Sequence, residues 1–84
     1  MEKTISSKES KIVAEMLYQL RITAGLRQSD MAKRLGVNQS FVSKVESGER
    51  RLDLVELTRI LRLLKADIHD FIRELERRTS ESRS

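Results

Sequence analysis

The sequence predicts an all-α fold of five short helices around one core. Proline is absent, glycine occurs three times, and Leu, Glu, Lys and Arg abound, as in helical proteins. Apolar residues recur at intervals of three and four along most of the chain, and capping residues and glycines divide this pattern into five segments. A chain of 84 residues forms one domain, and without cysteine it has no disulfide framework.

The first helix is expected to begin at Ser6, because Ser6 and Glu9 have the spacing of a capping box. Residues 1–5 are expected to form a flexible arm. Gly25 is expected to end the helix, since glycine readily adopts the left-handed conformation that terminates helices. The buried stripe of this helix is expected to consist of Ile12, Met16, Leu17 and Leu20.

The segment from Gln28 to Ser47 contains two short helical patterns separated by Gly36. Glycine at this position allows the chain to reverse within about three residues. Ala32 provides the small side chain that a close helix crossing needs. This segment is therefore predicted to be a helix-turn-helix. The residues facing the core are expected to be Met31, Ala32 and Leu35 in the first helix and Val42 and Val45 in the second.

Two more helices are expected after the motif. Asp53 and Glu56 have capping-box spacing at the start of the fourth, and Asp67 can cap the fifth. Residues 78–84 are polar and are expected to be a flexible tail, which leaves residues 6–77 as the folded domain. The apolar face of the fourth helix is expected to consist of Leu54, Leu57, Ile60, Leu61 and Leu64.

The motif resembles the phage repressor and Cro type of helix-turn-helix, also called the xenobiotic response element family. The resemblance covers roughly residues 10–75 and implies a five-helix bundle of the lambda-repressor-like DNA-binding type. One departure is Arg27, where the family usually has Thr or Ser to cap the second helix. The resemblance rests on Gln28, Met31, Ala32, Leu35, Gly36, Val37, Val42, Val45 and the run Glu46, Ser47, Gly48.

The excess positive charge lies on the motif and its flanks. Residues 21–51 contain seven basic and three acidic side chains, a net charge of +4, and the rest of the chain sums to zero. A basic surface at this place favours contact with double-stranded DNA. The alternative interpretation is an ordinary set of solvated Lys and Arg side chains.

A projection of the third helix at 100° per residue, with the core between Val42 and Val45, identifies the side chains that point outward. Phe41 falls on the flank and is expected to pack rather than to contact a base. Gln39 lies in the first turn, the part of a recognition helix that enters the major groove, and its amide can pair with adenine. The expected base-reading residues, which also match reading positions of the phage repressors, are Gln39, Ser40, Ser43 and Lys44.

A second group of residues is expected to bind phosphates and to position the protein. The resemblance implies that the Gln28 amide binds a phosphate and braces the first residues of the recognition helix. In the alternative interpretation, Gln28 is only an exposed residue at a helix start. The other expected phosphate-binding residues are Arg27, Lys33, Arg34, Ser47, Arg50 and Arg51. Glu46 lies near the apolar side of its helix, and the family pairs this glutamate with an arginine. We therefore expect an ion pair between Arg21 and Glu46, rather than two independent surface charges.

A homodimer is expected, because one recognition helix contacts too few base pairs to discriminate against a genome. The dimer surface is expected on the fifth helix with the end of the fourth, where the apolar stripe is wide. In the alternative, the fifth helix only closes its own core against the first. The expected interface residues are Ile68, Phe71, Ile72 and Leu75.

The sequence offers little for an enzyme. The single histidine, His69, lies beside Asp67 and Asp70 at a helix start, where capping explains the acids. Neither a cofactor nor a metal site is expected.

No signal peptide or membrane span is evident, so a cytoplasmic protein is expected. The predicted function is a sequence-specific transcriptional regulator, most plausibly a repressor, that binds a palindromic operator as a homodimer. The alternative is an adaptor or antitoxin of the same fold that binds another protein.

Overall fold

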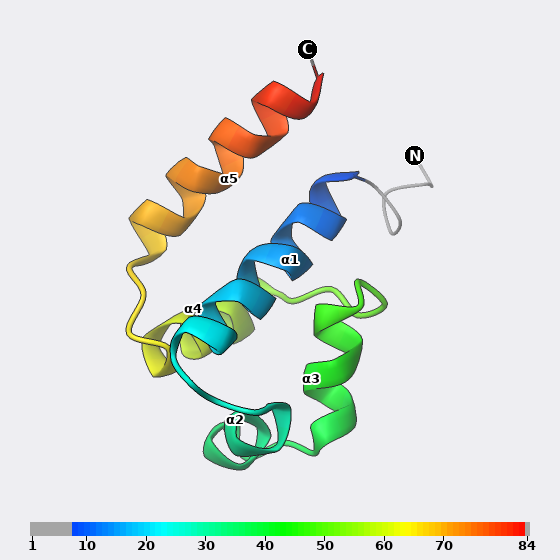
Figure 1. Ribbon diagram of the computed structural model, residues 1–84, viewed down its shortest axis with the longest axis vertical. Helices are drawn as coiled ribbons and strands as arrows, with labels where there is room; N and C mark the ends of the chain where they lie inside the picture. Colours follow the sequence, from blue (N-terminus) through cyan, green and yellow to red (C-terminus); the bar gives the residue numbers. More distant parts are fainter. Residues whose placement is uncertain (1–7, 84) are drawn as a thin grey trace.

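The computed structural model describes residues 8–83 and contains five helices in that range (Figure 1). The chain passes along α1, turns through α2 and α3 at the opposite end of the molecule, and returns behind α1 as α4 before α5 runs back beside α1. The expected start at Ser6 and the arm of residues 1–5 lie outside the described residues. The helices are α1 (Lys8–Thr23), α2 (Gln28–Leu35), α3 (Gln39–Glu46), α4 (Leu54–Leu63) and α5 (Ile68–Arg83).

The helix ends follow the predicted capping chemistry at most junctions. Gly25 and Gly36 have φ angles of 76° and 77°, the left-handed conformation expected of them. The Asp53 carboxylate accepts the Glu56 N–H at 2.7 Å, and the Glu56 carboxylate accepts the Asp53 N–H at 3.0 Å, which completes the predicted capping box. The Asp67 carboxylate likewise accepts the first free N–H groups of α5.

The turn after α4 contains no glycine. Lys65 takes the left-handed conformation there, with a φ angle of 59°. A lysine is strained in this conformation, but the Ala66 N–H still closes the turn on the Leu61 carbonyl at 2.9 Å. The turn therefore reverses the chain between α4 and α5 without the residue that usually marks such a site.

The core lies between α1, the motif and α4, and it contains most of the predicted apolar residues. Leu54 is an exception, because its side chain is 67% exposed. Leu54 is the first residue of α4, and Leu57, one turn later, is the first residue of this helix that packs against the core. The prediction that Leu54 is buried is therefore wrong. The fully or nearly buried members of the core are Ala14, Met16, Leu17, Met31, Ala32, Val42, Val45, Ile60, Leu61, Leu64 and Phe71.

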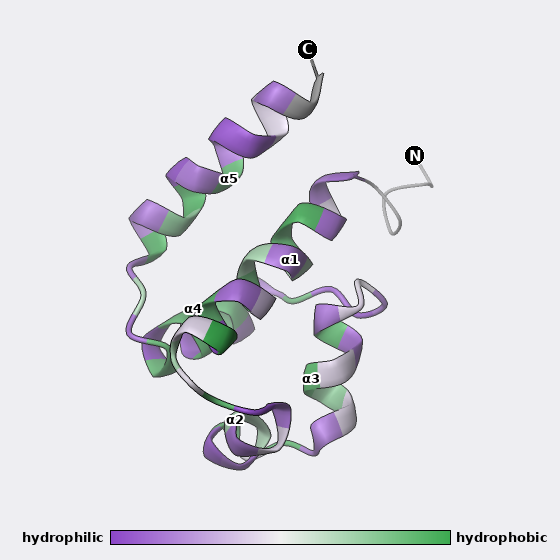
Figure 2. Ribbon diagram, viewed as in Figure 1, coloured by the Kyte–Doolittle hydropathy of each residue, from purple (hydrophilic) through white to green (hydrophobic). Residues whose placement is uncertain are grey.

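The fifth helix corrects two further predictions. Phe71 is only 4% exposed and packs in the core of its own chain, so it is not available as a central residue of a dimer surface. The segment that was expected to be a flexible tail continues as helix to Arg83. Figure 2 shows that this outer part of α5 is hydrophilic, with its apolar residues concentrated nearer the start of the helix.

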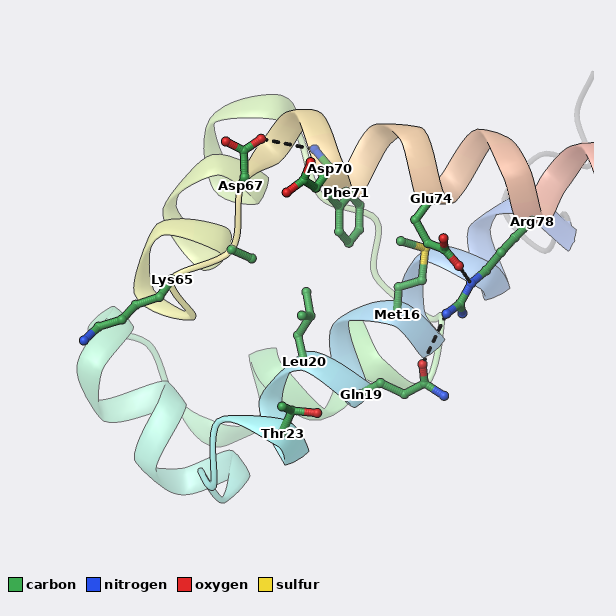
Figure 3. Close-up of a pocket in the computed structure, with 11 residues that line it drawn as sticks. Met16, Gln19, Leu20, Thr23, Lys65, Asp67, Asp70, Phe71, Glu74 and Arg78 are labelled. Carbon is green, nitrogen blue, oxygen red and sulfur yellow. Dashed lines mark hydrogen bonds and ion pairs between the residues drawn. The ribbon is translucent and has the colours of Figure 1, made fainter.

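Ion pairs along the helix explain why the polar end of α5 is helical. Arg77 bonds Glu74 and Glu81, and Arg78 bonds Glu74 at 2.6 Å, all at spacings of three or four residues. The two arginines lower the pKa of Glu74 to about 2. Arg78 also reaches Gln19 on α1 across a groove of about 520 Å³ between the two helices (Figure 3). Sequence composition alone did not reveal these side-chain pairs.

Candidate nucleic-acid interface

The exposed face of α3 carries the side chains that the projection selected. Val42 and Val45 are buried, and Gln39, Ser40, Ser43, Lys44 and Ser47 are exposed. Phe41 is partly buried, in keeping with its place on the flank. The outward face is therefore narrow and built from small polar groups with one cation. Such a face can approach the edges of base pairs closely.

Asn38 fixes the beginning of α3, a role that the sequence reading missed. Its Oδ1 accepts the Phe41 N–H at 3.2 Å and the Ser40 hydroxyl at 2.8 Å. Asparagine is among the favoured N-cap residues, and its position two residues after Gly36 was the available signal. The cap orients the turn that contains Gln39.

The beginning of α2 shows how the chain tolerates Arg27 where the family usually has Thr or Ser. The Arg27 side chain carries only donors and cannot cap the helix. Asp30, three residues later, instead accepts the Arg27 N–H at 3.0 Å and also pairs with its guanidinium. The helix can begin without a capping side chain at Arg27, because Asp30 supplies half of a capping box.

A buried ion pair joins α1 to α3. Arg21 donates to both carboxylate oxygens of Glu46, with distances of 2.6 and 3.0 Å. The two side chains are only 7% and 5% exposed, and Arg21 also donates to the Leu26 carbonyl at 2.7 Å. The hydrogen bond to Glu46 raises the pKa of Arg21, and burial opposes this effect. The bidentate geometry holds the end of α3 at a fixed angle to α1.

Gln28 links this ion pair to the first turn of α3. Its Nε2 donates to Glu46 Oε1 at 3.1 Å, and its Oε1 accepts from Gln39 Nε2 at 3.3 Å. Gln28 therefore contacts α3 at both of its ends, at Gln39 in the first turn and at Glu46 in the last. This is the bracing position that the resemblance implied for Gln28.

The predicted phosphate-binding cations separate into two groups. Arg50 is held by its own chain: its guanidinium pairs with Glu56 at 3.0 and 3.1 Å and stacks 4.6 Å from the centre of the Phe41 ring. The same pair lowers the pKa of Glu56. Arg50 thus fastens the loop after α3 to α4, so part of its hydrogen-bonding capacity is already used within its own chain. The other predicted phosphate-binding cations are exposed: Arg27, which also pairs with Asp30, and Lys33, Arg34 and Arg51.

Within residues 8–83, no helix combines the length and the apolar character needed to cross a bilayer.

The family model of the helix-turn-helix domain matches residues 13–78, most of the chain. No curated protein sequence matches significantly.

Solved structures extend this result. An XRE-family like protein from Pseudomonas syringae pv. tomato str. DC3000 is 39% identical over 92% of this chain and 94% of that chain, with a TM-score of 0.81. The wild-type restriction-modification controller protein C.Esp1396I shares the fold at 22% identity over 86% and 95% of the two chains, with a TM-score of 0.77. The chain therefore belongs to the helix-turn-helix domain family, in its XRE type, and is a DNA-binding transcriptional regulator.

Proposed function

We propose that the protein is a repressor that binds a palindromic operator as a homodimer, with α3 in the major groove of each half-site. The observation that carries this proposal is the outward face of α3, which presents Gln39 and small polar side chains. The opposite face of the helix is apolar and buried in the core. Gln39, Ser43 and Lys44 are the proposed base-reading positions, with Ser40 held partly by its bond to Asn38. The fold and the family are those of non-enzymatic DNA-binding proteins.

The reading role of Gln39 predicts a loss that depends on DNA sequence. Gln39→Ala should weaken binding to the cognate site by about 1 to 3 kcal/mol, because a bidentate contact with a base is removed. Binding to random duplex DNA should hardly change. Fluorescence anisotropy with both duplexes, at several salt concentrations, measures the two effects.

Arg51→Ala is the matched control, since Arg51 is exposed in the loop after α3, outside the proposed base-reading set. It should weaken both duplexes alike and reduce the slope of log affinity against log salt by up to about one unit. An equal loss on cognate and random DNA for Gln39→Ala would remove Gln39 from the base-reading set.

The proposed dimer surface includes the beginning of α4 in place of its end. Leu54 and Val55 are each 67% exposed there, and Ile72 on α5 is 38% exposed. Leu57 and Leu75, one turn from Leu54 and from Ile72, line the same hollow of about 250 Å³. We propose that a second copy of the chain covers these exposed aliphatic side chains. Ile68 and Leu75, the other two α5 residues of the proposed surface, are each partly buried.

Val55→Glu tests this surface. The variant should stay folded, because Val55 makes little contact with its own core, and it should sediment or scatter light as a monomer. Its affinity for a palindromic site should fall at least 100-fold, since the gain from joining two half-sites is lost. Ile22→Glu, at a similarly exposed aliphatic residue on α1, should remain dimeric. A dimeric Val55→Glu that binds DNA normally would place the interface elsewhere.

A further inference from the structure

A hollow of about 260 Å³ lies where the end of α2 meets α4, and three arginines line it. Arg34 comes from α2, and Arg59 and Arg62 come from α4. All three side chains are exposed, and the partly buried Leu35 and Leu63 complete the lining. Arg59 donates one N–H to the Leu35 carbonyl at 3.3 Å. We call the three arginines the arginine cluster.

The arginine cluster differs in its pairing from most other arginines of the protein. Within residues 8–83, no member of the cluster forms an ion pair with a carboxylate, and no carboxylate lines the hollow. The cluster is therefore a local excess of positive charge. The arginines that do pair with carboxylates of their own chain are Arg21, Arg27, Arg50, Arg73, Arg77 and Arg78.

The acids nearest to the arginine cluster are already engaged. Asp30 is bound to Arg27, and Glu56 is bound to Arg50, so the charge of each acid is balanced by another arginine. The ends of α2 and α4 both favour a nearby cation, which accounts for the position of the cluster. This effect leaves guanidinium N–H donors exposed to solvent and available to an external acceptor.

The chemistry of the arginine cluster suits phosphate. A guanidinium group can donate two parallel N–H bonds to phosphate oxygens, and it keeps its charge at any physiological pH. Several such groups around one hollow favour a ligand that carries more than one negative charge. The polyanion that a DNA-binding protein contacts is the backbone of DNA.

The course of α4 places the arginine cluster away from the proposed two-fold axis. Val55, in the first turn of α4, belongs to the proposed dimer surface. Arg62 follows seven residues later, and is therefore about 10 Å farther along the helix. Arg34 lies on α2, whose first residue, Gln28, contacts the first turn of α3. The cluster thus continues the basic motif on the side that faces away from the second copy.

We propose that the arginine cluster binds the phosphate backbone of the DNA that flanks the operator. Each half-site is then contacted at two places, by the motif at the operator and by the cluster outside it. The proposal rests on the proposed binding of an operator by a homodimer. Phosphate contacts carry no sequence information, so the flanking DNA needs no particular sequence.

The test compares two duplexes that contain the same operator, selected from a random pool. The short duplex ends at the operator, and the long duplex adds about ten base pairs of arbitrary sequence, one helical turn, at each end. Fluorescence anisotropy measures both affinities over a series of salt concentrations. The variant is Arg62→Glu, and the matched control is Lys11→Glu, which makes the same charge change at an exposed residue of α1 outside the hollow.

The unchanged protein and Lys11→Glu should bind the long duplex about tenfold more tightly than the short one at low salt. The slope of log affinity against log salt should be steeper on the long duplex by about two units, one for each half-site. In Arg62→Glu the ratio of affinities should fall to about twofold or less, while its affinity for the short duplex should stay within about threefold of that of Lys11→Glu. Arg62→Gln, which removes the charge without reversing it, should give an intermediate ratio, and circular dichroism verifies that each variant is folded.

Three results would overturn the proposal, and they have different meanings. Equal affinities of the unchanged protein for the two duplexes would show that the cluster does not contact flanking DNA, while operator binding stands. A normal ratio in a folded Arg62→Glu would assign the flanking contact to other residues, and would leave the cluster for another ligand, such as an acidic protein segment. If no operator is enriched from the random pool, the proposed function fails and this proposal fails with it.

Discussion

Replacing Glu46 with alanine is expected to lower the free energy of unfolding by about 3 kcal/mol. The substitution removes the carboxylate that pairs with the buried Arg21 guanidinium and leaves the Leu26 carbonyl and the Tyr18 ring beside it, and a buried charge without its counter-ion is strongly destabilising. By charge alone, loss of an acid near DNA would strengthen binding. The expected result is therefore a less stable protein despite a more favourable net charge, and urea denaturation at one protein concentration measures it.

A double-mutant cycle and a charge control make this result specific. Arg21→Ala together with Glu46→Ala should cost less than the sum of the single substitutions, because neither partner is then left alone. Glu49→Ala removes the same charge from an exposed position just after α3 and should change stability by less than about 0.5 kcal/mol. Strict additivity in the cycle would mean that the two side chains act independently.

Phe71→Ala is expected to lower the free energy of unfolding by about 3 to 5 kcal/mol. The ring is buried where α5 packs against the core, and its removal loses apolar burial and leaves a cavity. A small domain has little stability to lose, so the variant should be close to unfolding at 25 °C. Thermal and urea denaturation, followed by circular dichroism, measure the change.

Ile22→Ala is the control for this prediction, because Ile22 is a large aliphatic residue that is half exposed on α1. Its effect should remain below about 1 kcal/mol. A Phe71→Ala protein of normal stability that had become monomeric would contradict the packing described for α5 and return Phe71 to the dimer surface.

Local patterns explain which parts of the fold could be predicted. Helix periodicity, the glycines at positions 25 and 36, and the acids at 53 and 67 act within a few residues, so the sequence contains the information directly. The faces of α3 followed from Val42 and Val45 in the same way. The turn after α4 had no glycine to mark it, because Lys65 takes the left-handed conformation there, which lysine rarely adopts.

The failed predictions depend on contacts between distant segments. An apolar stripe identifies the buried side of a helix but does not say where the neighbouring helices end, so Leu54 was predicted on the buried face and Phe71 in a dimer interface. The engagement of Arg50 needed Phe41 and Glu56 to meet in space. The helical tail of α5 depended on ion pairs whose contribution composition does not show.

Selection of bound sites from a random pool of DNA duplexes, at a stated salt concentration, tests the central claim most directly. If two copies present α3 to successive major grooves on one face of DNA, the enriched sites should contain two inverted half-sites with centres about 34 Å, or one helical turn, apart. Gln39→Ala should lose preference at the same position in both half-sites. A folded protein that enriches no recurrent sequence, while it binds duplex DNA only through charge, would contradict the account.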